Sequence, residues 1–141
     1  MATKQLKSIY QIKISLIGAK PPIWRTVLVP SDLGLGAFHD VIQVAMGWTD
    51  SHLHQFFDNE KSYGIPDDDF ELETEDEADY KLSQLLKNEK ETIIYEYDFG
   101  DSWEHKILLE KILPFDTHTL LPVCIKGTRL SAGRLRRHLG L

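Results

Sequence analysis

Residues 8–18 read Ser-Ile-Tyr-Gln-Ile-Lys-Ile-Ser-Leu-Ile-Gly, and residues 23–29 read Ile-Trp-Arg-Thr-Val-Leu-Val. In both stretches apolar side chains recur at every second position, as they do on a strand with one buried face. The segment between them, Gly18-Ala-Lys-Pro-Pro22, favours a turn because two consecutive prolines cannot donate hydrogen bonds to a sheet. The two stretches therefore predict an antiparallel hairpin at the start of the fold.

Farther along the chain, the apolar period changes between that of a helix and that of a strand. From Leu35 onward apolar side chains recur every three to four residues, which predicts an amphipathic helix that ends near Gly47. A second, short helix is expected at residues 81–87, and strands are expected at residues 51–57, 92–99 and 103–109. The order strand-strand-helix-strand-helix-strand-strand predicts an α+β domain with a largely antiparallel sheet of about five strands and two helices.

Length and composition limit the class of protein. The chain has 141 residues, of which 42% are hydrophobic and 27% are charged, as expected for one globular domain. Cys124 is the single cysteine, which excludes an internal disulfide and a cysteine cage for zinc within one chain. No apolar run approaches the ~18 residues of a membrane span, and the first residues lack the apolar core of a signal peptide. We therefore expect a cytoplasmic protein with no membrane partner.

The net charge of −6 is unevenly distributed. Residues 67–80 hold nine carboxylates and no base, whereas residues 126–141 hold five bases and no acid. Because densely packed like charges repel and resist pairing, we predict a solvated acidic loop at residues 67–79. The alternatives are a docking surface for a basic partner and a cation site, although the run lacks the glycine turn and oxygen spacing of a calcium loop.

Two turns combine polar and aromatic residues in a way that indicates function. Residues 48–54 read Trp-Thr-Asp-Ser-His-Leu-His, and residues 98–105 read Asp-Phe-Gly-Asp-Ser-Trp-Glu-His. Loops carry functional residues more often than core positions do. If both turns lie at the same end of the sheet, we expect an aromatic and polar binding surface formed by Trp24, Trp48, Asp50, Asp98 and Trp103.

A divalent metal site is an alternative use of the same turns. His52 and His54 are two positions apart, so on a strand they would share a face and could both reach one ion. A further ligand would come from His105, Asp101 or His39. The competing interpretation is that these histidines face water or cap a turn, since a His-x-His pattern alone has low specificity.

Other chemistry has less support in the sequence. Ser51, Ser102 and Cys124 lack the surroundings of an activated nucleophile, although His105 beside Asp101 has the residue types for acid–base work. Nucleic-acid binding would require a basic face, and the bases cluster at the C-terminal end. We therefore expect a binding module for a protein or small-molecule partner, with no cofactor apart from a divalent metal. A metal-assisted enzyme and a DNA-associated protein are the alternatives.

Four segments in order along the chain carry a resemblance to a known family: residues 9–16, 20–25, 44–56 and 95–105. Together they resemble the plasmid pRiA open-reading-frame-three-like family of small bacterial and archaeal domains, over roughly residues 8–128. The resemblance implies an α+β domain without an established biochemical activity. It also implies a loose link, by name, to plasmid and resolvase-like contexts, and it supplies no catalytic residue.

The chain departs from that family after Arg129, where the family typically continues Cys-Pro-Pro-Glu-Asp-Cys-Gly-Gly. Residues 130–141 read Leu-Ser-Ala-Gly-Arg-Leu-Arg-Arg-His-Leu-Gly-Leu. One permitted back-translation of this tail, read one base later, gives Cys-Pro-Pro-Glu-Asp-Cys-Gly-Gly-Thr-Trp-Gly. We therefore expect a single domain at residues 1–129, followed by a frameshifted and poorly ordered tail that has lost two cysteines. The coding DNA tests this, since an offset that restores no such motif contradicts it.

Overall fold

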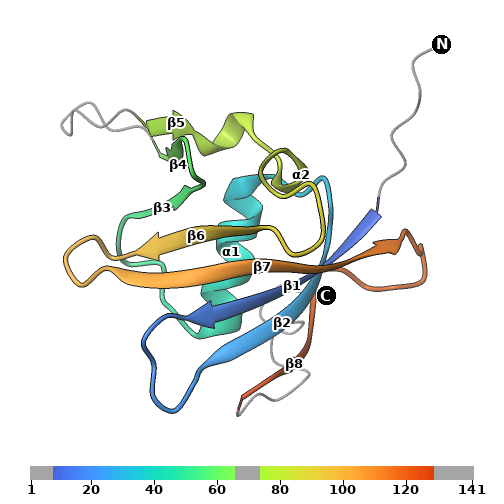
Figure 1. The fold of residues 1–141 in the computed structure, drawn as a ribbon, viewed down its shortest axis with the longest axis horizontal. Coiled ribbons are helices and arrows are strands. Elements are labelled where there is room, and N and C mark those ends of the chain that lie inside the picture. Colours follow the sequence, from blue (N-terminus) through green and yellow to red (C-terminus); the bar gives the residue numbers. More distant parts are fainter. Residues whose placement is uncertain (1–7, 66–73, 129–141) are drawn as a thin grey trace.

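The computed structural model describes residues 8–65 and 74–128. Within these ranges eight strands form one mixed sheet, in the spatial order β5-β4-β3-β6-β7-β1-β2-β8 (Figure 1). The strands are β1 (Ser8–Leu16), β2 (Trp24–Pro30), β3 (His54–Phe57), β4 (Ser62–Gly64), β5 (Thr74–Asp76), β6 (Thr92–Tyr97), β7 (Trp103–Pro114) and β8 (Val123–Gly127). The helices are α1 (Leu35–Met46), the 3-10 turn η1 (Glu77–Asp79) and α2 (Leu82–Leu85).

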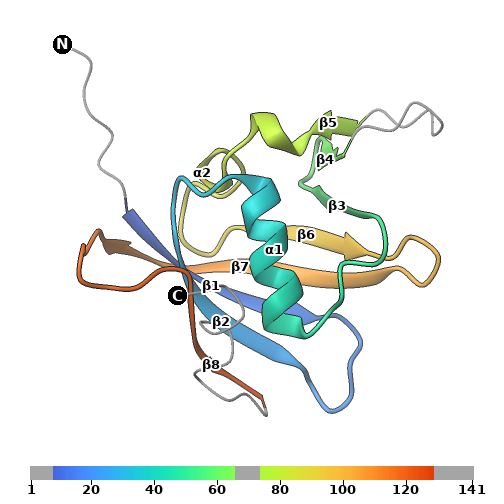
Figure 2. The same ribbon diagram turned by 180° about the vertical axis from the view of Figure 1, so that it is seen from behind.

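Helix α1 lies across one face of the sheet, as the view from behind shows (Figure 2). The alternating side chains Tyr10, Ile12 and Ile14 of β1 are buried in one core cluster together with Phe38 and Ile42 of α1. Each large apolar side chain that is fully buried in this way contributes about 1.5–3 kcal/mol. Apolar side chains recur at every second residue in the strands and at every third or fourth residue in the helix. This spacing therefore determines which face of the sheet packs against which face of α1.

The predicted hairpin and the predicted first helix are confirmed. Strand β1 pairs antiparallel with β2, from Ile9 opposite Pro30 to Ser15 opposite Trp24. Helix α1 ends at Met46 and is capped by Gly47, which has φ +79° and donates its backbone N–H to the carbonyls of Gln43 and Val44. A residue without a Cβ adopts this left-handed conformation at no steric cost.

The expected sheet of about five antiparallel strands was too small. Strands β4, β5 and β8 were not predicted, and β4 pairs parallel with β5, so that the sheet is mixed. Strands β4 and β5 have three residues each, which is too short for an apolar period to be recognised. Strand β7 continues to Pro114, and β3 begins at His54 and not at residue 51.

The acidic run is folded over part of its length. Residues 74–79, predicted as part of a loop, form β5 and η1, in which the Asp76 carboxylate accepts a hydrogen bond from the backbone N–H of Ala78 at 2.9 Å. Residues 67–73 lie outside the described residues, and so does the tail at residues 130–141 for which a frameshift is expected. In the described ranges, no helix has the length and apolar character required to cross a membrane.

Gly127 gives a direct test of the pairing between β2 and β8. A Cβ atom at this position would lie 2.7 Å from both Arg25 Cδ and the Trp24 carbonyl oxygen. Because the second contact is with backbone, we expect Gly127→Ala to lower the free energy of unfolding by about 1–3 kcal/mol, measured by urea denaturation. Gly100→Ala is the control, since its nearest contact is an ordinary 3.4 Å. Equal losses in both variants would contradict the pairing.

Candidate functional site

The two polar turns pack against each other because β3 and β6 are neighbours in the sheet. The Asp98 backbone N–H donates to the Leu53 carbonyl oxygen at 2.8 Å. The Ser51 backbone N–H donates to the Tyr97 hydroxyl, also at 2.8 Å. His52 Nε2 lies 3.6 Å from Asp98 Oδ2. The segments around residues 48–54 and 98–105 thus form one continuous surface.

A cavity of about 400 Å³ opens on one side of this junction. Part of its lining is polar and consists of three histidines and three carboxylates: His39, His52, His54, Asp40, Asp50 and Glu77. Another part is an apolar wall of Leu53, Ile65 and Phe99. None of the described residues that line the cavity is a lysine or an arginine. The charged groups in the lining therefore favour a cationic or neutral ligand over an anion.

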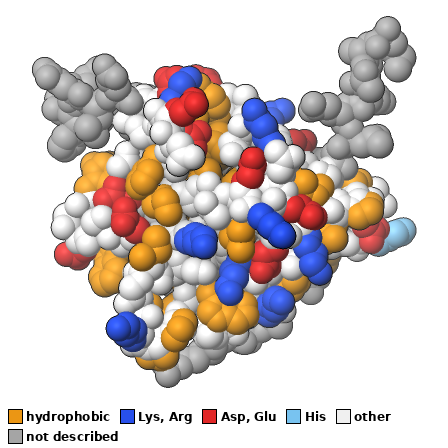
Figure 3. All heavy atoms as spheres, in the orientation of Figure 1, with side chains coloured by type: hydrophobic (Ala, Val, Ile, Leu, Met, Phe, Trp, Pro, Cys, Tyr) orange, Lys and Arg blue, Asp and Glu red, His pale blue; other side chains and the backbone are white. Residues whose placement is uncertain are grey.

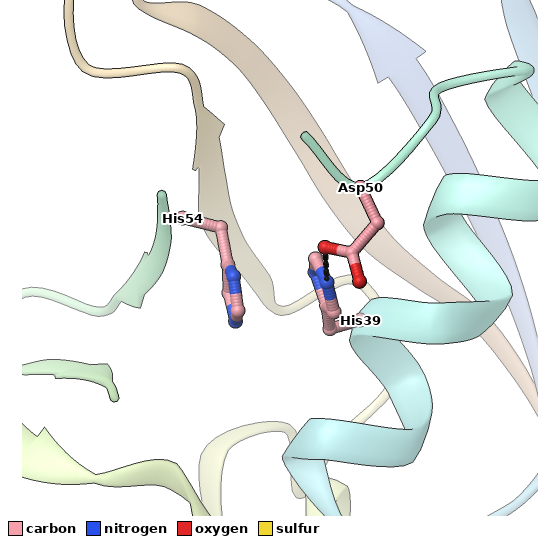
Figure 4. A group of neighbouring side chains, drawn as sticks. All are labelled: His39, Asp50 and His54. Carbon is pink, nitrogen blue, oxygen red and sulfur yellow. Dashed lines mark hydrogen bonds and ion pairs between the residues drawn. The ribbon is translucent and has the colours of Figure 1, made fainter. Parts of the chain in front are cut away.

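Two buried imidazole rings are stacked in the lining of this cavity. His39 of α1 and His54 of β3 have ring centroids 3.6 Å apart, and their planes differ by 11° (Figure 4). Each ring has its own carboxylate partner. His39 Nε2 lies 2.8 Å from Asp50 Oδ1, and His54 Nε2 lies 2.7 Å from Glu77 Oε1. Helix α1, the turn after it, β3 and η1 all contribute to this group.

A chain of hydrogen bonds fixes the tautomer of His39. The Asp50 backbone N–H donates to Gln43 Oε1 at 2.7 Å, which turns Gln43 Nε2 towards the Tyr95 hydroxyl as a donor at 2.8 Å. The Tyr95 hydroxyl then donates to His39 Nδ1 at 2.6 Å, so that Nε2 carries the ring proton and donates it to Asp50.

Burial explains the protonation states of His39 and Tyr95 in this series of hydrogen bonds. The pKa of His39 is lowered by burial first and by the facing His54 second, although Asp50 and Glu77 act in the opposite direction. Burial also raises the pKa of Tyr95. Near neutral pH the His39 ring is therefore uncharged, and the Tyr95 hydroxyl keeps its proton.

The residues predicted as metal ligands lie in different places, and of the three alternatives for a further ligand only His39 lies beside His54. His54 belongs to the stacked pair. The half-exposed His52 lines the same cavity but faces Asp98. Asp101 is exposed in the turn between β6 and β7, where its backbone N–H donates to Asp98 Oδ1 at 3.4 Å.

His105 is fully buried, and both of its ring nitrogens have partners. Its Nδ1–H donates to the Tyr95 carbonyl oxygen at 3.1 Å, and its Nε2 accepts from Trp48 Nε1, also at 3.1 Å. His105 therefore holds the Trp48 indole in place. It is not part of the His39, Asp50 and His54 group whose ligand atoms lie close together.

The burial of His105 gives a pH-dependent stability. Burial lowers the pKa of this ring below the ~6.5 of an unfolded histidine. As pH falls from 6.5 towards the folded pKa, the unfolded chain therefore binds a proton that the folded ring does not, and stability is lost. We expect the free energy of unfolding to fall between pH 7 and pH 5, and to fall less in His105→Gln, which keeps an acceptor for the indole. Chemical denaturation at both pH values checks this, and an equal fall in the two proteins would contradict it.

Of the five residues predicted as a binding surface, three line one of two cavities and two line neither. Asp50 lines the first cavity. Trp48 and Trp103, with ring centroids 5.8 Å apart, line a second cavity of about 770 Å³ together with residues 16–23. Asp98 joins the two turns through its backbone N–H, which donates to Leu53, and through its carboxylate, which faces His52. Trp24 lines neither cavity, and its ring lies 4.7 Å below the Lys13 ammonium group.

Three residues of the site were missed by sequence reasoning: Gln43, Glu77 and Tyr95. Gln43 follows His39 by four positions, and this spacing on one helix face is a signal that the sequence contains. Glu77 lies in a run of acids, with no local feature that marks it as buried. Tyr95 looks like an ordinary core residue of a strand, because the sequence does not show what its hydroxyl contacts.

The fold and the site define a small α+β domain with a cavity lined by histidines and carboxylates. Residues 8–132 match the model of the family described as Plasmid pRiA4b ORF-3-like protein, and the chain belongs to this family. The resemblance seen in the sequence is thereby confirmed.

Two relatives show how far the similarity extends. The uncharacterized protein y4hQ of Sinorhizobium fredii is 36% identical over 111 residues, which cover 76% of this chain and 56% of that protein. This chain thus spans little more than half the length of that curated relative. The crystal structure of MM3350, a protein of unknown function from Methanosarcina mazei Go1, has a TM-score of 0.77 at 35% identity, covering 87% of this chain and 70% of the other. The domain is accordingly one of uncharacterised function, and its role has to be argued from the site.

Proposed function

We propose that this domain is a binding module for a small ligand that occupies the cavity beside the joined turns. The observation that carries the proposal is the lining of this cavity of about 400 Å³, in which convergent polar side chains face an apolar wall. Small-molecule sites are typically concave, about 300–1,000 Å³ in volume, and mainly apolar with a few placed polar groups.

The two parts of the lining indicate the chemistry of the ligand. Leu53, Ile65 and Phe99 are 43%, 63% and 36% exposed, so a ligand that covers them gains about 25 cal/mol for each Å² of apolar surface buried. The carboxylates of Asp40 and Asp50 favour a group that is positively charged or donates hydrogen bonds. We therefore expect a small organic ligand with an apolar part and a cationic or donor part.

A nucleic-acid partner has less support than a small ligand. Phosphate recognition requires a basic surface, and on the sheet face opposite α1 the Lys and Arg side chains lie among Asp, Glu and apolar side chains (Figure 3). A protein partner would have its best apolar contact at the second cavity, where Trp103 is 41% exposed. The cytoplasmic location expected from the sequence stays a prediction.

Amide chemical shifts of the ¹⁵N-labelled protein, recorded with a library of small cationic and neutral aromatic compounds, test the small-ligand proposal. We expect shift changes at residues 50–54 and at Phe99 with compounds that bind. Changes centred on Trp103 would favour the second cavity, and changes confined to the opposite sheet face would overturn the proposal.

Two phenylalanine variants sharpen this experiment. Phe99→Ala removes part of the apolar wall, and we expect it to weaken binding about fivefold, which corresponds to about 1 kcal/mol. Phe115→Ala is the matched control, because Phe115 is similarly exposed at 43% and does not line the cavity. Equal effects of the two substitutions on the dissociation constant would contradict a role of the apolar wall.

A further inference from the structure

We propose that His39, Asp50 and His54 bind one divalent transition-metal ion of the zinc class in this cavity. The proposal deepens the proposed function, because it names an ion in the same cavity and leaves the apolar wall for the organic part of a ligand. It differs from the ligand set expected from the sequence: His54 and the alternative third ligand His39 are kept, whereas His52, His105 and Asp101 are not.

The donor atoms come from three separate elements and meet in one place. One ligand atom from each of the three residues lies within 4.8 Å of the other two. Two imidazole nitrogens and one carboxylate oxygen are ligands that suit zinc, iron, cobalt and nickel, whereas calcium and magnesium prefer oxygen alone. Three protein ligands also leave at least one coordination position open, as in metal sites that contact a substrate or ligand.

The charges around the stacked rings favour a cation. Asp40, Asp50 and Glu77 line the cavity, and none of the described lining residues is a lysine or an arginine that would offset them. The two side chains in contact are both buried, at 6% exposure for His39 and 4% for His54. A divalent ion there would balance the carboxylates of Asp50 and Glu77, whose side chains are 58% and 9% exposed, so that water screens Glu77 less than Asp50.

The groups behind the two rings also fit metal ligation. A histidine that binds a metal usually donates its other N–H to a carboxylate, a carbonyl or a similar acceptor. His54 Nε2 already has Glu77 Oε1 at 2.7 Å, which leaves Nδ1 as the ring nitrogen for an ion. His39 has Nε2 towards Asp50, and Tyr95 lies behind its Nδ1 at 2.6 Å.

Metal binding requires several local changes from the arrangement in Figure 4. The rings must tilt out of their nearly parallel stack, because the lone pair of each coordinating nitrogen lies in its ring plane. The proton on His39 Nε2 must leave that atom, so that Nδ1–H donates to the Tyr95 oxygen. When the Tyr95 hydroxyl then donates to Gln43, the amide of Gln43 turns over and releases the Asp50 backbone. Asp50 is thereby free to move towards the ion.

Cobalt gives a direct spectroscopic test, because its visible absorption reports the number and geometry of nitrogen and oxygen ligands. We expect the chelator-treated full chain to bind one cobalt ion, with a visible band that zinc abolishes by competition. We expect His39→Gln, His54→Gln and Asp50→Asn each to weaken cobalt binding by more than ~10-fold, and Glu77→Gln to weaken it by about 10-fold through the orientation of His54.

The control variants are His52→Gln, which changes a histidine in the same cavity, and His118→Gln, which changes one outside it. Both should bind cobalt like the wild type. Circular dichroism of each variant shows whether it is folded. A second readout needs no variant: in the wild type, zinc should shift the imidazole ¹⁵N resonances of His39 and His54 and leave those of His105 unchanged.

Three results would overturn the metal site. They are no visible cobalt band in the wild type, loss of the band in His52→Gln with retention in His39→Gln, and zinc shifts at His105 without shifts at His39. The small-ligand proposal is tested independently by chemical shifts of the metal-free protein. Compounds that bind the metal-free cavity while cobalt does not bind would retain that proposal and remove the metal. If cobalt binds but no compound binds the metal-free protein, the metal site is retained and the small-ligand proposal is removed.

Discussion

Replacing Glu77 by alanine is expected to lower the free energy of unfolding by about 1–3 kcal/mol. The Glu77 and His54 side chains are 9% and 4% exposed, and their Oε1 and Nε2 atoms lie 2.7 Å apart. Removal of the carboxylate leaves the buried Nε2 of His54 without its hydrogen-bond partner, and a buried polar group without a partner costs about 1–3 kcal/mol. Urea denaturation of the wild type and of Glu77→Ala at pH 7 measures the difference.

Glu75→Ala is the matched control from the same acidic run. Glu75 lies 3.6 Å from Lys61, but both side chains are about half exposed, so this pair contributes at most about 1 kcal/mol. A double variant, His54→Phe with Glu77→Ala, should lose less stability than the sum of the two single variants, because no unpaired polar group is left. Equal losses in the free energy of unfolding for Glu75→Ala and Glu77→Ala would contradict the stabilising role of the buried contact between Glu77 and His54.

Trp48→Ala is expected to cost about 3 kcal/mol, because Trp48 holds the two turns together. Its ring centroid lies 5.3 Å from that of Tyr97 and 5.8 Å from that of Trp103, and its indole N–H donates to His105. Trp48→Phe keeps most of the packing but leaves His105 Nε2 without its donor, so we expect a smaller loss of about 1–2 kcal/mol.

Trp103→Ala is the control for Trp48→Ala in the same denaturation experiment. Trp103 is 41% exposed, so it loses less packing on truncation, and we expect less than half the effect of Trp48→Ala. Near-ultraviolet circular dichroism should change strongly in the Trp48 variant. A loss in Trp103→Ala as large as in Trp48→Ala would contradict the role of Trp48 at the junction.

Much of the fold could be predicted from the sequence because its main elements are long and periodic. Strands β1 and β2 alternate over seven or more residues, and α1 has twelve residues with a regular apolar face. Strands β4 and β5 could not be predicted, since three residues do not establish a period. They form because neighbouring strands supply hydrogen-bond partners, and that contact is not local in sequence.

The site could be predicted only in part. Asp50 and His54 were expected at the junction, because they lie in a turn rich in polar and aromatic residues. The burial of Glu77 depends on η1 packing near α1, where Gly36 lacks a Cβ that would lie 3.3 Å from Glu77 Oε2. His105 has the residue type of a ligand, and only the tertiary structure shows that both of its nitrogens are engaged.

X-ray diffraction at the zinc absorption edge, from crystals of the 141-residue chain grown with zinc, tests most directly what the cavity holds. We predict one anomalous peak in the cavity, about 2.0–2.2 Å from His39 Nε2, from a carboxylate oxygen of Asp50 and from a ring nitrogen of His54. The absence of a peak at these three side chains, in crystals where zinc is bound by His52 or by other exposed side chains, would contradict the site.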